Sequence, residues 1–162
     1  MGLMQQRGKY RRPIAGQPSN KSVVGGQPTV QYFEDFYVYT VLFAALLAGT
    51  AQTEIIQIQA DADFKWIKGT YQADIADAAF VESTQPVPNV TVQITDTGTG
   101  KALFQTPIPI PTIFGRGTLP FILPIARIFS ARSAMQFQAN NYDAAVDYNI
   151  YLQLIGMKVW EQ

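Results

Sequence analysis

Two aspartates, Asp61 and Asp63, are the residues of this sequence whose type and spacing best suit chemistry. They lie two positions apart in a stretch that alternates apolar and polar residues, so in a β-strand both carboxylates would point from one face. Such a pair can bind a cation or act as an acid and a base. Either role needs a pocket and further groups, which the sequence does not name. We therefore interpret the two residues as part of a solvated strand face.

Other charged residues offer weaker sites. Asp143 and Asp147 could clamp a metal across a turn, although Asn and Asp in turns usually bond their own backbone. Arg116, Arg127 and Arg132 could bind an anion, but aromatic residues lie between them. Salt bridges between subunits and protection of edge strands explain these arginines more simply.

Gly98, Gly100 and Lys101 suggest comparison with a phosphate-binding loop. That loop needs a longer gap between its glycines, a Ser or Thr after the Lys, and then a helix. Between two strands, these glycines indicate a β-hairpin instead.

The sequence also contains no His and no Cys, which removes the commonest general base and the thiolate metal ligands. We therefore expect no cofactor, no metal site and no enzymatic activity.

The charge is distributed unevenly along the chain. The 12 basic residues balance the 12 acidic ones, yet the first 21 residues contain five basic residues and no acid, which leaves a net charge of −5 on the remainder. Residues 1–31 are also rich in Gln, Gly and Pro, and too poor in large apolar side chains to form a core. We predict an extended basic arm over 1–31 that contacts an acidic surface on a partner protein. The predicted contact residues are Arg7, Lys9, Arg11 and Arg12. A solvated leader that keeps the chain soluble is the simpler alternative.

Alternating hydrophobicity predicts the strands of the body, residues 32–162. The longest run joins Ile56 to Trp66, where every second residue can be buried, and we predict one long strand there, followed by a reversal at Gly69. Further strands are predicted over residues 33–47, 71–75, 90–95, 121–129, 134–139 and 146–160, with a bulge at Gly156. About eight strands and almost no helix indicate an all-β fold, an antiparallel β-sandwich, and we expect a jelly roll.

Two apolar segments need a separate account. Residues 36–49 are uncharged but shorter than the roughly 20 residues of a membrane span, so we predict a buried strand or an interface element, and no membrane partner. The second segment is rich in proline and extended, and it lies off the sheet interior or on its edge. Its apolar residues Ile108, Ile110 and Phe114 are predicted to contact a sister subunit. Covering one mouth of their own sandwich is an equal alternative.

Four features together resemble a known group of proteins. They are the basic arm, the Gln-Ala-Asp-Ala-Asp-Phe run that ends at Phe64, the hairpin over residues 95–101, and the closing strand that ends Gly-Met-Lys-Val-Trp at Trp160. This order resembles small structural proteins of tailed-bacteriophage virions, and among them the capsid decoration, or cement, proteins. The resemblance implies a non-enzymatic homotrimer on the capsid exterior, with the major capsid protein as partner. It further implies no specific recognition of nucleic acid, and a location in the host cytoplasm during assembly.

Two other functions stay open at this stage. A receptor- or glycan-binding sandwich of a head or tail fibre would use the loops around Tyr142 and Phe114. A carboxylate enzyme would use Asp61 and Asp63.

Overall fold

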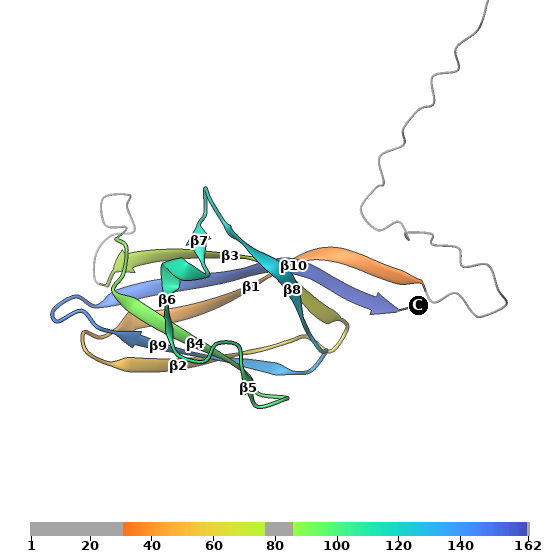
Figure 1. The fold of residues 1–162 in the computed structure, drawn as a ribbon, viewed down its shortest axis with the longest axis horizontal. Coiled ribbons are helices and arrows are strands. Elements are labelled where there is room, and N and C mark those ends of the chain that lie inside the picture. The colour runs from red at the N-terminus through yellow and green to blue at the C-terminus, as the bar shows by residue number, and fades with distance from the viewer. Residues whose placement is uncertain (1–30, 77–85, 162) are drawn as a thin grey trace, which may run out of the picture.

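The computed structural model describes residues 31–76 and 86–161, which form two β-sheets stacked face to face (Figure 1). The first sheet has the strand order β1-β10-β3, and both β7 and β8 pair with β3. The second has the order β2-β9-β4-β5, and β6 also pairs with β4. Apart from a two-residue parallel contact between β3 and β7, the described pairings are antiparallel. The predicted all-β antiparallel sandwich is confirmed.

The elements have the following bounds: β1 Tyr32–Leu46, β2 Ala51–Gln57, β3 Asp63–Ile75, β4 Val90–Asp96, β5 Lys101–Ala102, β6 Ile108–Pro109, the 3-10 helix η2 Ile110–Thr112, β7 Gly115–Arg116, β8 Phe121–Phe129, β9 Ala134–Asn141 and β10 Tyr148–Glu161. The apolar segment 36–49 falls mostly in β1, but it is not buried throughout, because Phe36, Leu42 and Leu47 are exposed. No helix in the described part of the chain is long and apolar enough to cross a membrane.

The core lies between the inner faces of the two sheets, where alternate residues of each central strand are buried. Met135, Phe137 and Ala139 of β9 are fully buried, and the even-numbered residues between them are more accessible. The same alternation holds in β4 and β10. One face of each strand therefore excludes water while the other stays accessible, which is the arrangement that a period of two predicts.

The prediction of one strand from Ile56 to Trp66 is wrong. β2 ends at Gln57, a turn follows at Ala60 and Asp61, and β3 starts in the other sheet. Ile58 and Ala62 are buried on either side of the turn, as the alternation predicts, but Ala60 within the turn is exposed, so the predicted burial of Ala60 is wrong. Alternation of residue types therefore does not report whether the strand is continuous.

The predicted reversal at Gly69 is also wrong, because β3 runs through this residue to Ile75. Gly69 serves packing: a Cβ atom there would lie 2.8 Å from the carbonyl oxygen of Ile113 and 2.9 Å from the ring of Phe114. Two other glycine predictions are confirmed. The register shifts between Ile155 and Gly156, as a bulge requires, and Gly100 has a φ of +66° in the hairpin between β4 and β5.

Candidate interaction surface

The two aspartates with the best spacing for chemistry are held apart by their surroundings. The Asp61 carboxylate lies in the turn before β3 and forms an ion pair with Lys158, with 2.7 Å between Nζ and Oδ2. That bond lowers the pKa of Asp61. Asp63 instead accepts a hydrogen bond from the backbone N–H of Ala131 at 2.8 Å. The prediction that both lie on one strand face is wrong, because Asp61 lies in the turn and only Asp63 belongs to β3.

In the loop between β9 and β10, Asp143 holds its own backbone, as the turn chemistry predicted, whereas Asp147 holds the neighbouring loop between β1 and β2. Asp143 Oδ1 accepts from the N–H groups of Ala145 and Val146, and Oδ2 accepts from the Tyr148 hydroxyl at 3.0 Å. Asp147 accepts from the N–H of Ala48 at 2.7 Å. Among the residues that the structure describes, no three acidic, His or Cys side chains gather as a metal site.

The hydrogen bonds to Asp143 predict a stability that depends on pH. Donation by the Ala145 N–H, and then by the Tyr148 hydroxyl, lowers the pKa of this carboxyl in the folded protein below its ordinary value, which is about 3.9. The unfolded chain then takes up the proton first as the pH falls, so the stabilisation present above about pH 4 is lost as the pH falls through the folded pKa. Urea titrations at pH 7, 5, 4 and 3 should show this loss, and it should be smaller in Asp143→Asn. Equal slopes in both proteins would contradict the assignment.

The structure distributes the three arginines over different places. Arg116 lies on β7 and lines a hollow with Thr70 and Gln153. Arg127 lies on β8 and lines an apolar groove, while Arg132 follows β8 in a turn with a φ of +67°. The predicted arm residues Arg7, Lys9, Arg11 and Arg12 lie outside the described residues.

Burial corrects the predicted subunit interface at Ile110 and Phe114. Both side chains are 0% exposed, and the Phe114 ring stacks on Trp66 with 5.8 Å between ring centroids. The cause is the short turn at η2, where the Phe114 N–H donates to the carbonyl of Ile110 at 3.0 Å and turns both side chains toward the core. They therefore cover their own sandwich, and only Ile108 is partly accessible for a neighbour.

An exposed apolar surface lies instead on β8 and the turn before it. Its members are 62 to 79% exposed and are called the β8 patch from here on: Leu119, Ile122, Ile125 and Ile128. A scattered exposed Leu or Ile is ordinary, but four of them gathered in one short segment mark a candidate contact site. Because β8 pairs with β3 on one side and with no further described strand on the other, this patch lies at an open edge of the first sheet.

The patch continues across the outer face of the first sheet. In one row Ile128 lies opposite Lys65, which lies opposite Met157 and then Phe36. In a second row Ile122 lies opposite Lys68, Ile155 and Val38. Directly paired residues share a face. The outer face therefore combines apolar side chains with the two lysines of β3.

A groove of about 430 Å³ runs beside the patch, where β8 approaches the segment that leads from β5 to η2. Its walls are mostly apolar: Trp66, Leu103, Phe104, Ile108, Thr112, Ile113, Phe121, Leu123, Pro124, Ile125 and Arg127. β8 bulges away from β3 here. Trp66 pairs with Arg127 and Lys68 pairs with Ile122, so the four residues of β8 between these two pairs have no partner on β3. Pro124 lies in that bulge and has no N–H to donate.

The charges around the β8 patch are mainly positive. Lys68 and Arg127 form no ion pair within the described ranges, whereas Lys65 pairs with Glu34 at 3.2 Å. A partner that covers the patch must therefore bring apolar side chains together with carboxylates.

The β8 strand was predicted from the sequence, but its exposed apolar face was not. A signal was present, because residues 121–129 are apolar at both odd and even positions, so no single buried face can accommodate them all. Such a strand is either covered on both sides or offers one side to a partner. The sequence alone does not distinguish these two cases.

Comparison with solved structures finds distant similarities. The infectious bursal disease virus VP2 subviral particle is 9% identical with a TM-score of 0.31, over 91% of this chain and 42% of that one. Dimeric latent PorU from Porphyromonas gingivalis is 12% identical with a TM-score of 0.36, over 90% of this chain and 14% of that one. The infectious bursal disease virus Gt strain structure is 10% identical with a TM-score of 0.29, over 89% and 38%.

Two of these three structures thus come from a virus, and this chain spans less than half the length of each matched chain. No protein family matches the sequence, and no curated protein does. Similarity this distant assigns no function.

Proposed function

We propose that this chain is a non-enzymatic structural subunit of a virion, a capsid decoration or cement protein that stabilises the capsid lattice from the exterior. The basic arm binds an acidic surface of the major capsid protein, and the sandwich body contacts further copies of itself as a homotrimer. Many weak contacts of this kind, repeated over a lattice, hold tightly together.

The strand pairing supports the finer prediction of a jelly roll. The first and last long strands pair, β1 with β10, and the next strands inward pair in turn: β2 with β9, β3 with β8, and β4 with β5. This order arises when one long antiparallel hairpin wraps into two sheets, and jelly rolls are common among virion subunits. A sandwich can serve many functions, so the fold by itself does not decide between them.

The β8 patch is the observation that carries the proposal. Its side chains lie at an open sheet edge and are at least 62% exposed. Burying one such side chain stabilises a contact by about 1.5 to 3 kcal/mol, before the cost of association is subtracted. A subunit that functions within an assembly accounts for this surface.

The arm makes the proposal testable in the full-length chain. Replacing Arg7, Lys9, Arg11 and Arg12 by Ser removes four of the five positive charges of the arm. We expect co-sedimentation with virion shells prepared without this protein to weaken about tenfold or more, because charge attraction to the shell is lost. Light scattering should show an unchanged mass in solution, since the body is intact.

Lys101→Ser is the matched control, because Lys101 is exposed on β5 and lies outside the arm. It should sediment with shells as the wild type does. Full co-sedimentation of the arm variant would contradict the proposed role of the arm.

The competing function, a receptor- or glycan-binding sandwich, loses one of its predicted site residues. Tyr142 is exposed, but the ring of Phe114 is buried against Trp66 and offers no face to a sugar. Binding of the isolated protein to a glycan array, without any affinity for shells, would favour this function over ours.

A further inference from the structure

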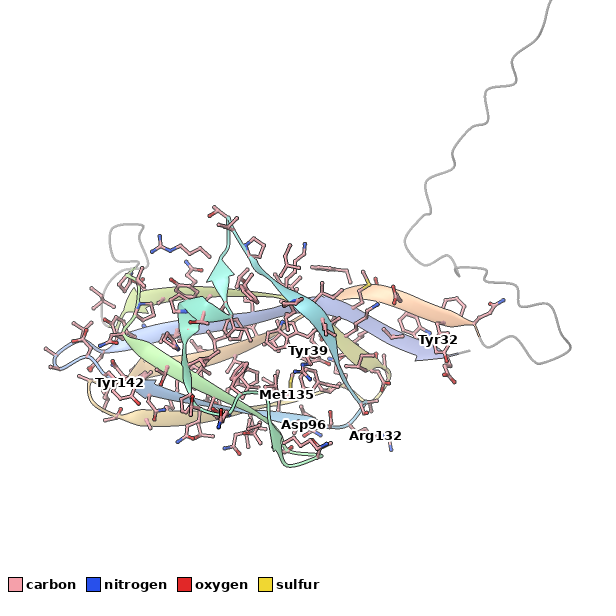
Figure 2. The ribbon with its side chains drawn as sticks, in the orientation of Figure 1. Tyr32, Tyr39, Asp96, Arg132, Met135 and Tyr142 are labelled. Atoms are coloured by element: carbon pink, nitrogen blue, oxygen red, sulfur yellow. The ribbon has the colours of Figure 1, made fainter. Side chains whose placement is uncertain are left out.

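Four segments meet at one end of the sandwich, which we call the loop end: residues 47–50, 75–76, 86–89 and 142–147. Backbone hydrogen bonds tie them together. The N–H of Ala76 donates to the carbonyl of Asp147 at 2.8 Å, and that of Tyr142 donates to the carbonyl of Asn89 at 2.9 Å. Buried Asn141 adds side-chain bonds to the carbonyls of Leu46 and Val146 at 3.1 and 2.9 Å. The loop end is therefore a defined surface, and it lies at the opposite end of the molecule from Tyr32 (Figure 2).

This surface is both apolar and acidic. Its exposed apolar side chains are 40 to 62% accessible: Leu47, Ile75, Val87 and Tyr142. Asp143 and Asp147 add two carboxylates, and the four segments contain no Lys or Arg. The described hydrogen-bond donors to these carboxylates are neutral N–H and O–H groups, so the negative charges are not cancelled.

The β8 patch has the complementary character. It offers apolar side chains beside Lys68 on the outer face, and Lys68 forms no ion pair in the described structure. Arg127 lies opposite Trp66 and lines the groove instead. The two surfaces cannot meet within one molecule, because Lys68 and Ile75 lie seven residues apart on the same strand β3, which corresponds to about 23 Å.

We infer that the loop end of one copy docks on the β8 patch of a second copy of this chain. This inference rests on the proposed structural role and deepens it by naming the contact. The apolar residues of the loop end cover the outer-face residues of the patch, while Asp143 and Asp147 lie against Lys68. The contact joins two different surfaces, so repeated copies close into a ring, such as the proposed trimer, or continue as an array.

Contacts between like surfaces are less favourable. Two β8 patches facing each other would bring the cations of both copies together, and two loop ends would bring carboxylates together. Regular pairing between two β8 edges is further hindered by the bulge and by Pro124, which are common protections of a sheet edge. Docking through side chains against the loop end avoids both problems.

A charge swap in the full-length protein tests the contact. Lys68→Glu reverses the charge beside the patch, and Ala144→Lys places a cation on an exposed position next to Asp143. Each single variant should raise the concentration needed for assembly about tenfold or more, because it brings like charges together. The double variant should restore assembly, since the cation introduced at position 144 of one copy then faces the carboxylate introduced at position 68 of the next. Light-scattering mass over a concentration series is the measurement, and Lys101→Glu is the matched control.

Three outcomes would overturn the inference: a wild-type protein that stays monomeric throughout the series, a double variant that stays as weak as the singles, or a Lys68→Glu variant that assembles more strongly. The last result would indicate patches facing each other. Thermal unfolding of each variant distinguishes lost contact from lost folding. The shell assay tests the proposed function separately, because monomers can still bind shells through the arm, and rings can form without any affinity for shells.

Discussion

Gly156→Ala should lower the free energy of unfolding by about 3 kcal/mol or more. A Cβ atom at this position would lie 2.0 Å from the carbonyl oxygen of Lys65 and 2.9 Å from its carbonyl carbon. Both are backbone atoms of the paired strand β3, so a side-chain rotation cannot relieve the clash. The bulge between β10 and β3 depends on this close approach. Equilibrium urea unfolding followed by tryptophan fluorescence would measure the loss.

Gly117→Ala provides the matched control, because no atom lies within 4 Å of the Cβ position there. We expect its free energy of unfolding to stay within about 0.5 kcal/mol of the wild-type value. A similar small change in Gly156→Ala would mean that β10 and β3 pair without the bulge.

Sequence periodicity predicted the strands in which a single face is buried. β4, β9 and β10 alternate because the inner face of each sheet excludes water and the outer face does not. The same rule failed between Ile56 and Trp66 for a physical reason. Ile58 is buried although it lies outside both strands, and its N–H donates to the carbonyl of Ser133 at 2.8 Å. The sequence keeps its apolar alternation through the turn because Ala60 is small and tolerates exposure, so the residue types do not reveal the break.

The candidate site was less accessible to sequence reasoning than the fold. Apolar residues in a proline-rich loop suit a subunit contact and a self-covering loop equally well, because both require the same residue types. The difference between these two cases is whether the loop folds back onto its own sandwich. At η2 the loop does fold back, because two backbone N–H groups donate to the carbonyl of Ile110. The exposure of the β8 patch also depends on the tertiary structure, because β8 lies at the edge of a sheet. Edge position depends on long-range pairing that no local pattern specifies.

Phe114→Ala should destabilise the isolated subunit by about 3 to 5 kcal/mol. The Phe114 side chain is fully buried and stacks on Trp66, so its removal leaves a cavity between β3 and the turn at η2. A residue that served only an interface between subunits would behave differently. Its replacement would leave the unfolding of the monomer unchanged and would weaken only the assembly.

Leu119→Ala separates these two roles, because Leu119 is 78% exposed on the β8 patch. We expect its urea midpoint to match that of the wild type at concentrations where the protein is dilute and monomeric, while its assembly weakens. If Phe114→Ala instead kept the wild-type midpoint, the core would not include this ring, and the turn at η2 would be free to offer it to a neighbour. If both variants behave as expected, the proline-rich loop belongs to the core and the β8 patch to the contact between subunits. The opposite pair of results would place the loop in the contact instead.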